Sequence, residues 1–228
     1  MGEEERRQED IPVRTGQFMS QYIGQVLRSR AEEAIDKGDY KTAEQYWERA
    51  MIRPVKRMHS FVETSGYMLV TQYVHTYWAC HLVQEGKIEE AMNRAEQCFN
   101  FHPGGIDLAI HLVPLLESAG RKEEADLIFT RSFNSLLTVL ESYPDSAQFR
   151  NQAAWMSAKC KRELDTALAD STHAVKLRPN SAAYIDTLAE VQFVQGKTDE
   201  AIKTSRRALQ LEPDKDYYQK QLKRFLKA

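Results

Sequence analysis

The chain has 228 residues, and its 31 Lys and Arg against 33 Asp and Glu give a formal net charge of -2. This near balance excludes the broad positive surface expected of a general nucleic-acid binder. Ala, Glu, Lys, Leu and Gln recur throughout while Gly and Pro are sparse, so the composition predicts an all-α fold.

Membrane and secretion signals are missing from the sequence. No apolar run approaches the roughly 20 residues that cross a bilayer. The first ten residues, MGEEERRQED, lack the apolar core of a signal peptide. The three cysteines, Cys80, Cys98 and Cys160, are too few for a disulfide framework, and their odd number leaves at least one thiol free. We therefore expect a cytoplasmic protein with no membrane partner.

Residues 1–13 are highly charged and have no periodic apolar face, which predicts a disordered tail. Beyond them, a thirteen-residue pattern occurs five times. Successive copies are separated by 48, 34, 42 and 34 residues and begin near Gly38, Gly86, Gly120, Arg162 and Gly196. A pattern repeated in this way indicates stacked copies of one structural unit.

Each copy has the signature of a turn followed by an amphipathic helix, which we call helix B. Four copies begin with Gly, which suits the left-handed position after a helix end. A small residue follows five positions later, and a second one lies two helical turns beyond it. These side chains are Ala43, Ala91, Ala125, Ala167 and Ala201, then Ala50, Cys98, Ser132, Ala174 and Ala208. The small stripe predicts close packing against helix A, the amphipathic segment just upstream of each turn.

Irregular features interrupt the pattern at three places. The extra residues between the first two copies fall at 53–65, where we expect either a longer loop or lengthened helices. The extra residues before Arg162 predict that the third helix B continues to Tyr143. Pro114 predicts a kink or a late start in the third helix A.

The chain ends in an amphipathic segment, residues 214–228. Tyr218, Leu222, Phe225 and Leu226 lie on one side, which predicts a helix that covers the last repeat. Its basic residues, Lys220, Lys223 and Arg224, are interpreted as facing solvent.

The 34-residue spacing, the Gly, the two small residues and a Pro five residues further on resemble the tetratricopeptide repeat family. The last copy is the best match, with Leu188, Ala189, Gly196, Ala201, Ala208 and Pro213 at family positions. It departs from the family at Gln192 and Ser205, where aromatic residues are usual. The resemblance covers residues 17–228 and implies a right-handed α-α superhelix of about five helix hairpins plus the capping helix. It implies one domain over residues 14–228.

The resemblance also implies a function, because the A helices of such proteins line a concave groove that receives a protein segment. Counting from the turns assigns the following residues to that groove: Tyr73, Tyr77, Cys80, Gln84, His111, Asn151, Trp155, Met156, Lys159, Asp186 and Glu190. The expected partner is a protein or peptide with apolar or aromatic anchors. Asp186 and Glu190 are available there for a basic residue of the partner.

One groove assignment depends on the fourth turn, which lacks Gly. If Arg162 is aligned with the glycines of the other copies, Trp155 falls at the position that a small residue of helix A normally occupies. One inserted residue in the turn at Arg162 moves Ala154 to the small position and Trp155 to the groove, and we favour this shift. Some relatives bind the C-terminal carboxylate of a chaperone with a clamp of paired Lys and Asn on successive A helices. The corresponding A-helix positions of this chain do not supply that pair, which argues against a carboxylate clamp.

No catalytic or cofactor motif accompanies the repeats. The chain has no Cys-x-x-Cys, no His-x3-His on one helix, and no Gly-rich phosphate loop, so we expect no metal, no cofactor and no enzymatic activity. Cys80 and His111 are the one thiolate pair to consider, and a packed thiol is the preferred interpretation.

The main alternative to a binding module is a structural one. The same surface, or the long third helix B, then mediates self-assembly into a homodimer or larger scaffold, or the chain is a regulatory domain of a larger protein. RNA binding is disfavoured by the irregular spacings and the absence of a basic stripe.

Overall fold

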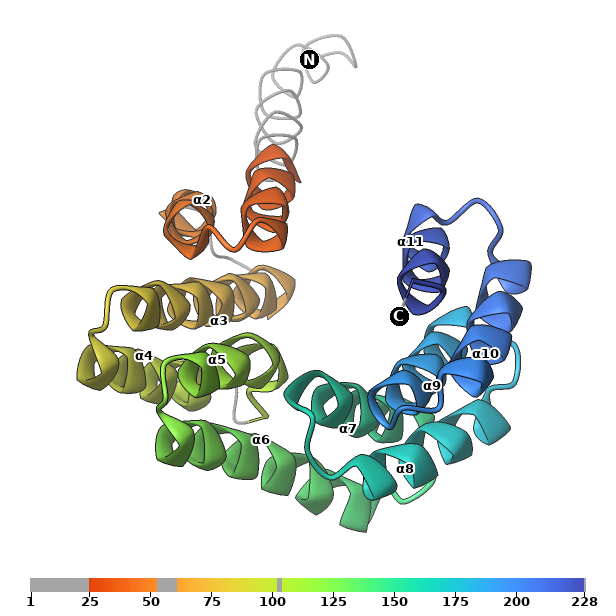
Figure 1. Cartoon of the computed structure of the whole chain (residues 1–228). Helices are drawn as coiled ribbons and strands as arrows, with labels where there is room; N and C mark the ends of the chain where they lie inside the picture. The colour runs from red at the N-terminus through yellow and green to blue at the C-terminus, as the bar shows by residue number, and fades with distance from the viewer. Residues whose placement is uncertain (1–24, 53–60, 102–103, 228) are drawn as a thin grey trace, which may run out of the picture. The chain divides into compact units, whose positions relative to one another are not determined.

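The computed structural model describes residues 25–52, 61–101 and 104–227, with the side chains of residues 51, 52, 61–69 and 101 left out. This part of the chain is built of α-helices and turns and contains no strand, which confirms the predicted all-α class (Figure 1). The predicted tail at residues 1–13 lies outside the described residues, as does most of the 53–65 segment. The chain forms two compact units, Met1–Gly120 and Arg121–Ala228.

The first unit holds a helix over residues 25–36, then α2 (Tyr40–Ile52), α3 (Phe61–Gln84), α4 (Ile88–Phe101) and α5 (Ile106–Ser118). Helix α3 packs against α2, α4 and α5, so it is the central helix of this unit. It begins at Phe61, which shows that lengthening of a helix accounts for part of the extra sequence between the first two copies. Helix α5 buries Leu108, Leu112 and Leu116 completely.

The second unit holds α6 (Lys122–Ser142), α7 (Ala147–Cys160), α8 (Leu164–Leu177), α9 (Ala182–Val194), α10 (Thr198–Leu211) and α11 (Asp216–Phe225). Helices α7 and α8 pack together, as do α9 and α10, so two helix hairpins follow one another. Helices α7 and α9 also contact each other directly. The long α6 confirms the predicted extension of the third helix B.

The small residues of the repeated pattern lie where close packing was predicted. Ala43, Ala91, Ala125 and Ala201 have no exposed surface, and Ala167 has 1%. At the second small position Cys98, Ser132, Ala174 and Ala208 are fully buried, whereas Ala50 is half-buried. A longer side chain at the buried positions has no room without moving a neighbouring helix.

Local signals in the sequence set the helix ends. Gly38, Gly86, Gly120 and Gly196 have φ between 70° and 80°, the left-handed region that ends a helix at low cost. Ser146 and Ser181 cap the A helices α7 and α9, because their hydroxyls accept from the backbone N–H groups three residues later. Three of the B helices, α4, α6 and α10, instead begin with an acidic pair, such as Glu123 and Glu124 of α6, and these charges favour the positive end of the helix dipole.

Prolines end the B helices of the second unit. Tyr143, Arg178 and Glu212 each precede a Pro and share φ near -134° and ψ near 70°. A residue before Pro is pushed out of the helical region by the proline ring, so each helix stops there. In the first unit Pro114 lies inside α5, which starts at Ile106, so the predicted late start is wrong.

Candidate functional site

Aromatic side chains gather on the first helix B, α2, and on the A helices α3 and α5 of the first unit, in a cluster that we call the aromatic face. Its members are Trp47 and Tyr40 of α2, Tyr73 and Tyr77 of α3, and His111 of α5. The rings of Trp47 and Tyr73 stack with centroids 4.6 Å apart, and Tyr77 stacks at 6.2 Å on both Tyr73 and Tyr40. The imidazole of His111 meets Tyr77 edge-on at 5.3 Å. These contacts hold the rings in one fixed row.

The inner and outer members of the aromatic face differ in exposure. The side chains of Trp47 and Tyr77 are only 3% and 4% exposed, and both belong to the hydrophobic core of the first unit. Tyr40, Tyr73 and His111 are half-buried and keep part of their surface exposed. Burial raises the pKa of Tyr40 and of Tyr73 to about 12, so both phenols are neutral hydrogen-bond donors at pH 7.

Two other predicted groove residues of α3 do not join this face. Cys80 is fully buried and offers no surface to a partner, so its assignment to the groove is wrong in this structure. Burial and nearby Cys98 raise the pKa of Cys80 far above its usual value, which also argues against a thiolate paired with His111. Gln84 is exposed, and its Nε2 donates to the carbonyl of Gly38 at 3.0 Å, which ties the end of α3 to the first turn.

The second unit contains the inserted residue that the sequence suggested at the fourth turn. Lys161 takes the left-handed conformation with φ of 54°, and its N–H donates to the carbonyl of Ala158, as Gly196 does to Phe193. Lys161 therefore occupies the glycine position, one residue before Arg162. Counting back from Lys161 places Ala154 at the small position, where it is fully buried.

Helix α7 carries four of the predicted groove residues in different environments. Trp155 is half-buried, and the ammonium of Lys159 lies 5.1 Å from the centre of its ring. Asn151 is half-buried, and its Oδ1 is buried without a hydrogen-bond partner among the described residues. Met156 has no exposed surface, so the structure contradicts its assignment to a partner-binding groove.

Asp186 and Glu190 lie one turn apart on α9 but are only 3% and 2% exposed. The hydroxyl of Tyr217 in α11 donates to Asp186 Oδ2 at 3.1 Å, and Arg224 of the same helix donates to Glu190 Oε2. The ammonium of Lys159 lies 3.9 Å from Glu190 Oε1. The basic and polar groups expected from a partner therefore come from the chain itself, which corrects the prediction that both carboxylates are available.

The same contacts correct the interpretation of the capping helix. Arg224 does not face solvent alone but forms an ion pair with a buried carboxylate and lies over the rings of Phe193 and Phe225. Tyr218 and Phe225 are buried as predicted, whereas Leu226 is largely exposed. The sequence pattern could not predict the contact of Arg224 with Glu190. Periodicity assigns a residue to a helix face but does not identify the helix that packs against that face.

The sequence pattern also did not predict a set of contacts between the fourth turn and α6, which we call the latch. Arg162 reaches from this turn to α6, where its guanidinium donates to the carbonyl of Ala125 at 3.1 Å and pairs with Asp126 at 2.8 Å. It also lies 5.3 Å from the ring centre of Phe129. The sequence feature that could have indicated this contact is the departure of the fourth turn from the pattern, because Arg162 stands there whereas the other four copies have Gly.

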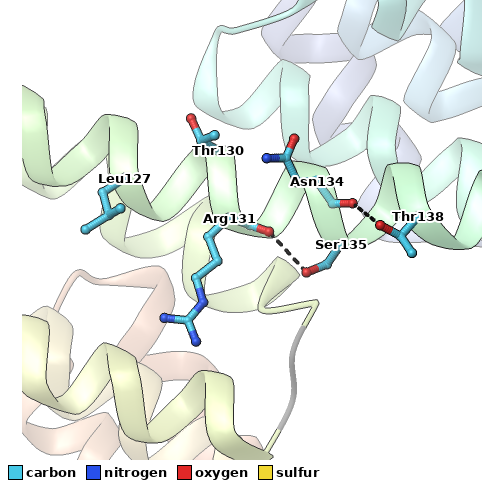
Figure 2. A pocket seen from close by; sticks show the side chains of 6 residues that line it. All are labelled: Leu127, Thr130, Arg131, Asn134, Ser135 and Thr138. Atoms are coloured by element: carbon cyan, nitrogen blue, oxygen red, sulfur yellow. Dashed lines mark hydrogen bonds between the residues drawn. The ribbon is translucent and has the colours of Figure 1, made fainter.

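A hollow with a volume of about 480 Å³ lies on α6 (Figure 2). The residues that line it follow one stripe of the helix: Leu127, Thr130, Arg131, Asn134, Ser135 and Thr138. The hydroxyls of Ser135 and Thr138 donate to backbone carbonyls four residues earlier, so they already have partners. The hollow has no converging set of charged or catalytic groups.

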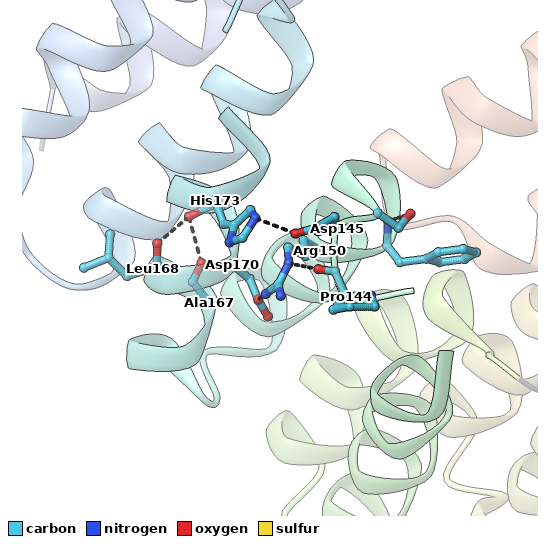
Figure 3. Close-up of polar contacts among 10 residues, drawn as sticks. Pro144, Asp145, Arg150, Ala167, Leu168, Asp170 and His173 are labelled. Atoms are coloured by element: carbon cyan, nitrogen blue, oxygen red, sulfur yellow. Dashed lines mark hydrogen bonds and ion pairs between the residues drawn. The ribbon is translucent and has the colours of Figure 1, made fainter. Parts of the chain in front are cut away.

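A polar cluster fixes the start of α7 against α8 (Figure 3). Arg150 donates to the carbonyl of Pro144 at 2.6 Å and pairs with Asp170, while His173 lies 3.3 Å from Asp145. Burial raises the pKa of Asp170, against the opposing effect of Arg150. These contacts join the turn after α6 to α8, and we interpret them as structural.

Metal centres and membrane spans are both missing from the described ranges. Within them, no three His, Cys, Asp or Glu side chains are placed to hold a metal ion together. No helix of residues 25–52, 61–101 or 104–227 combines the length and the apolar character needed to span a bilayer.

Comparisons with known proteins identify the fold. No protein-family profile and no curated protein matches the chain. TTC0263, a thermophilic TPR protein of Thermus thermophilus, is similar in structure with a TM-score of 0.54 at 17% identity, over 90% of this chain and 100% of that one. A tetratricopeptide repeat protein from Parabacteroides merdae gives a TM-score of 0.42 at 16% identity, over 90% and 72% of the two chains. The first likeness shows that this chain has the tetratricopeptide repeat fold, as its sequence predicted.

Proposed function

We propose that this chain is a non-catalytic interaction scaffold that binds an extended segment of a partner protein along its A helices. The fold supports this proposal, because stacked helix hairpins present long surfaces built from rigid elements. The composition supports a protein rather than a nucleic-acid partner, because the net charge is -2. No cofactor is required for such a role.

The aromatic face is the observation that carries the proposal. Tyr73 and His111 lie on A helices that pack against each other, and both residues are half-buried beside the buried rings of Trp47 and Tyr77. Pre-ordered aromatic side chains lose little entropy on binding and often dominate interface energies. A partner with apolar or aromatic anchors fits this surface best.

The proposed contact residues are a subset of those expected from the sequence. In the first unit they are Tyr73, Gln84 and His111, with Tyr77 as the buried support of the rings. In the second unit they are the half-buried Asn151, Trp155 and Lys159. Each of these keeps some exposed surface in its own unit.

Selection of peptides on the full chain tests the proposal. Peptides from a random displayed library are selected, synthesised and measured by calorimetry against the wild type, Tyr73→Ala and His111→Ala. We expect each variant to weaken binding about tenfold or more, because truncation of an aromatic anchor costs at least about 1–2 kcal/mol. Tyr143→Ala, which removes a tyrosine exposed at the end of α6, is the matched control and should bind normally.

Two further measurements keep this test interpretable. Tyr73→Phe retains the stacked ring and should retain most of the affinity, which separates lost contact from lost folding. Light scattering at micromolar concentration shows whether the chain is a monomer. Equal binding by wild type and both alanine variants contradicts the proposal, and a stable homodimer that buries these residues supports self-assembly instead.

A further inference from the structure

Negative charge adjoins the rings of the aromatic face. Asp107 lies on α5 one helical turn before His111, so the two side chains share one face of that helix. The buried Gln72 of α3 donates from its Nε2 to Asp107 Oδ2 at 3.4 Å, which holds this carboxylate beside α3. Asp107 itself is half-buried and keeps part of its surface exposed. A positioned and partly exposed carboxylate therefore lies next to the rings.

The charge of Asp107 acts on two rings of the aromatic face. Burial is the main cause that raises the pKa of Tyr73 and of Tyr77, and the negative charge of Asp107 is the next. The charge of Arg28 opposes the rise in the pKa of Tyr73, whereas that of Glu32 adds to it. Two carboxylates and one guanidinium thus act on Tyr73, which leaves the electrostatic potential there negative.

A cation of the chain itself already lies against one end of the stacked rings. The guanidinium of Arg28, from the helix over residues 25–36, lies 5.8 Å from the centre of the Trp47 ring. Within the described ranges, no cation lies over the ring of Tyr40 or of Tyr73. Aromatic rings attract cations through their electron-rich faces. The part of the aromatic face near Asp107 therefore combines rings, negative potential and partly exposed surface.

We propose that the aromatic face binds a basic side chain of the partner, a Lys or Arg that stands next to an apolar residue. The cation lies against Tyr73 and pairs with Asp107, while Glu32 adds a longer-range attraction. The apolar neighbour packs beside Tyr40. Charge complementarity selects this occupant, because an acidic segment would instead meet two carboxylates.

This inference rests on the proposed scaffold function, since it names the chemistry of the segment that the aromatic face would bind. It adds a requirement for positive charge, which an apolar or aromatic anchor alone does not meet. The two proposals are therefore tested separately, by comparing peptides that differ only in the charge of one side chain.

NMR titration of the full ¹⁵N-labelled chain with three short peptides tests the inference. The probes are acetyl-Leu-Lys-Leu-amide, its norleucine analogue, which has a similar stem without the charge, and its Glu analogue. We expect the lysine peptide to shift the amides of Tyr73, Asp107 and His111. It should bind at least about fivefold more tightly than the norleucine peptide, and the Glu peptide should bind most weakly.

Variants of the two carboxylates separate the effect of charge from that of folding. Asp107→Asn nearly keeps the size of the side chain and should reduce the preference for lysine over norleucine about threefold or more. Glu32→Gln should reduce this preference less, because Glu32 has the smaller effect on Tyr73. Glu89→Gln is the matched control: Glu89 of α4, like Asp107 of α5, is a first-turn carboxylate, and its loss should leave the preference unchanged.

Equal affinities of the lysine and norleucine peptides overturn the inference, as does an unchanged lysine preference in Asp107→Asn. Either result leaves the proposed function standing, because the neutral peptide still binds the aromatic face. Failure of all three peptides to bind also overturns the inference, and the library-selected peptides then test the proposed function on their own.

Discussion

Small side chains at fixed positions of helix B allow the hairpins to pack closely. Ala201 shows this for the last hairpin, where it is fully buried in one cluster with Ala189 of α9 and Phe225 of α11. The sequence made these positions predictable, because the spacing of five and then seven residues recurs in every copy. The stripe of small residues is thus a signal of packing that needs no knowledge of the partner helix.

Ala201→Glu should be strongly destabilising. The substitution forces a carboxylate into a site with no room and no partner, which costs more than about 3 kcal/mol. Lys203→Glu, an exposed change two residues further along α10, should alter stability by less than about 0.5 kcal/mol. Thermal unfolding followed by circular dichroism compares the two, and similar melting temperatures would argue against close packing at Ala201.

Turn residues offer a matched pair of opposite predictions. Gly196→Ala adds a Cβ where no atom lies within 4 Å, so its cost of about 1 kcal/mol is purely the strain of φ 80°. Lys161→Gly removes the same kind of strain at φ 54° and should stabilise the chain by about 1 kcal/mol. Denaturant unfolding measures both, and a stabilising Gly196→Ala would contradict the assigned turn.

Asp186 makes stability depend on pH. Burial raises the pKa of Asp186 to about 6, with nearby Glu190 adding to the effect and the hydrogen bond from Tyr217 opposing it. The folded state therefore binds this proton more tightly than the unfolded chain, whose carboxyl titrates near about 4. The resulting stabilisation is fully present below about pH 4 and is lost as pH rises through about 6.

Asp186→Asn should accordingly stabilise the protein at about pH 7.5 and not at about pH 4. The expected gain at the higher pH is on the order of 2 kcal/mol, because the neutral amide avoids burying a charge and still accepts from Tyr217. Asp214→Asn, in the exposed turn between α10 and α11, is the control and should show no such gain. Melting temperatures of the wild type and the Asp186 variant at both pH values test this prediction. An equal change in melting temperature at the two pH values would show that protonation of Asp186 is not coupled to stability.

The candidate site was predictable only in part at this scale. Spacing correctly placed Tyr73 and Tyr77 one turn apart on α3, but it could not reveal that stacking on Tyr40 and Tyr73 leaves Tyr77 buried. It placed Asp186 and Glu190 correctly on α9 and missed that α11 covers them. Periodicity reports the face of a residue, whereas exposure depends on which distant segment packs there.

The positions of whole helices and turns agree more closely with the sequence-based predictions than the exposure of single residues does. Gly and Pro are local signals, so the turns at Gly38, Gly86, Gly120 and Gly196 and the ends before Pro179 and Pro213 fall where expected. The capping helix is shorter than predicted, spanning Asp216–Phe225. Element type and order thus come from local chemistry, and the tertiary contacts between elements do not.

Arg162 should stabilise the contact between α6 and the fourth turn. Arg162→Ala removes a hydrogen bond to the Ala125 carbonyl and an ion pair with Asp126, from a side chain that is 16% exposed. The loss should cost about 1–3 kcal/mol. Arg162→Lys should recover only part of it, since an ammonium cannot copy the forked geometry of the guanidinium.

Hydrogen exchange locates this effect. The first turns of α6 should exchange faster in Arg162→Ala, while Lys122→Ala, an exposed change on the same helix, should leave them unchanged. Unaltered protection of α6 in the Arg162 variant would show that the latch contributes little.

At the scale of the whole molecule, each unit contains A helices that contact each other, α3 with α5 in the first and α7 with α9 in the second. This arrangement follows from the repeated hairpin and places the proposed contact residues on neighbouring helices within each unit. The single domain over residues 14–228 stays a prediction, since the chain forms two compact units. The identity of the partner is encoded in a few exposed side chains rather than in the repeat itself.

The most direct test of the scaffold account is an exchange footprint of the full chain with a library-selected peptide. Amide hydrogen exchange is measured with and without saturating peptide, and the account predicts added protection in α3 and α5, around Tyr73 and His111, with little change in α4. Protection confined to α4, or none in any A helix, would contradict it.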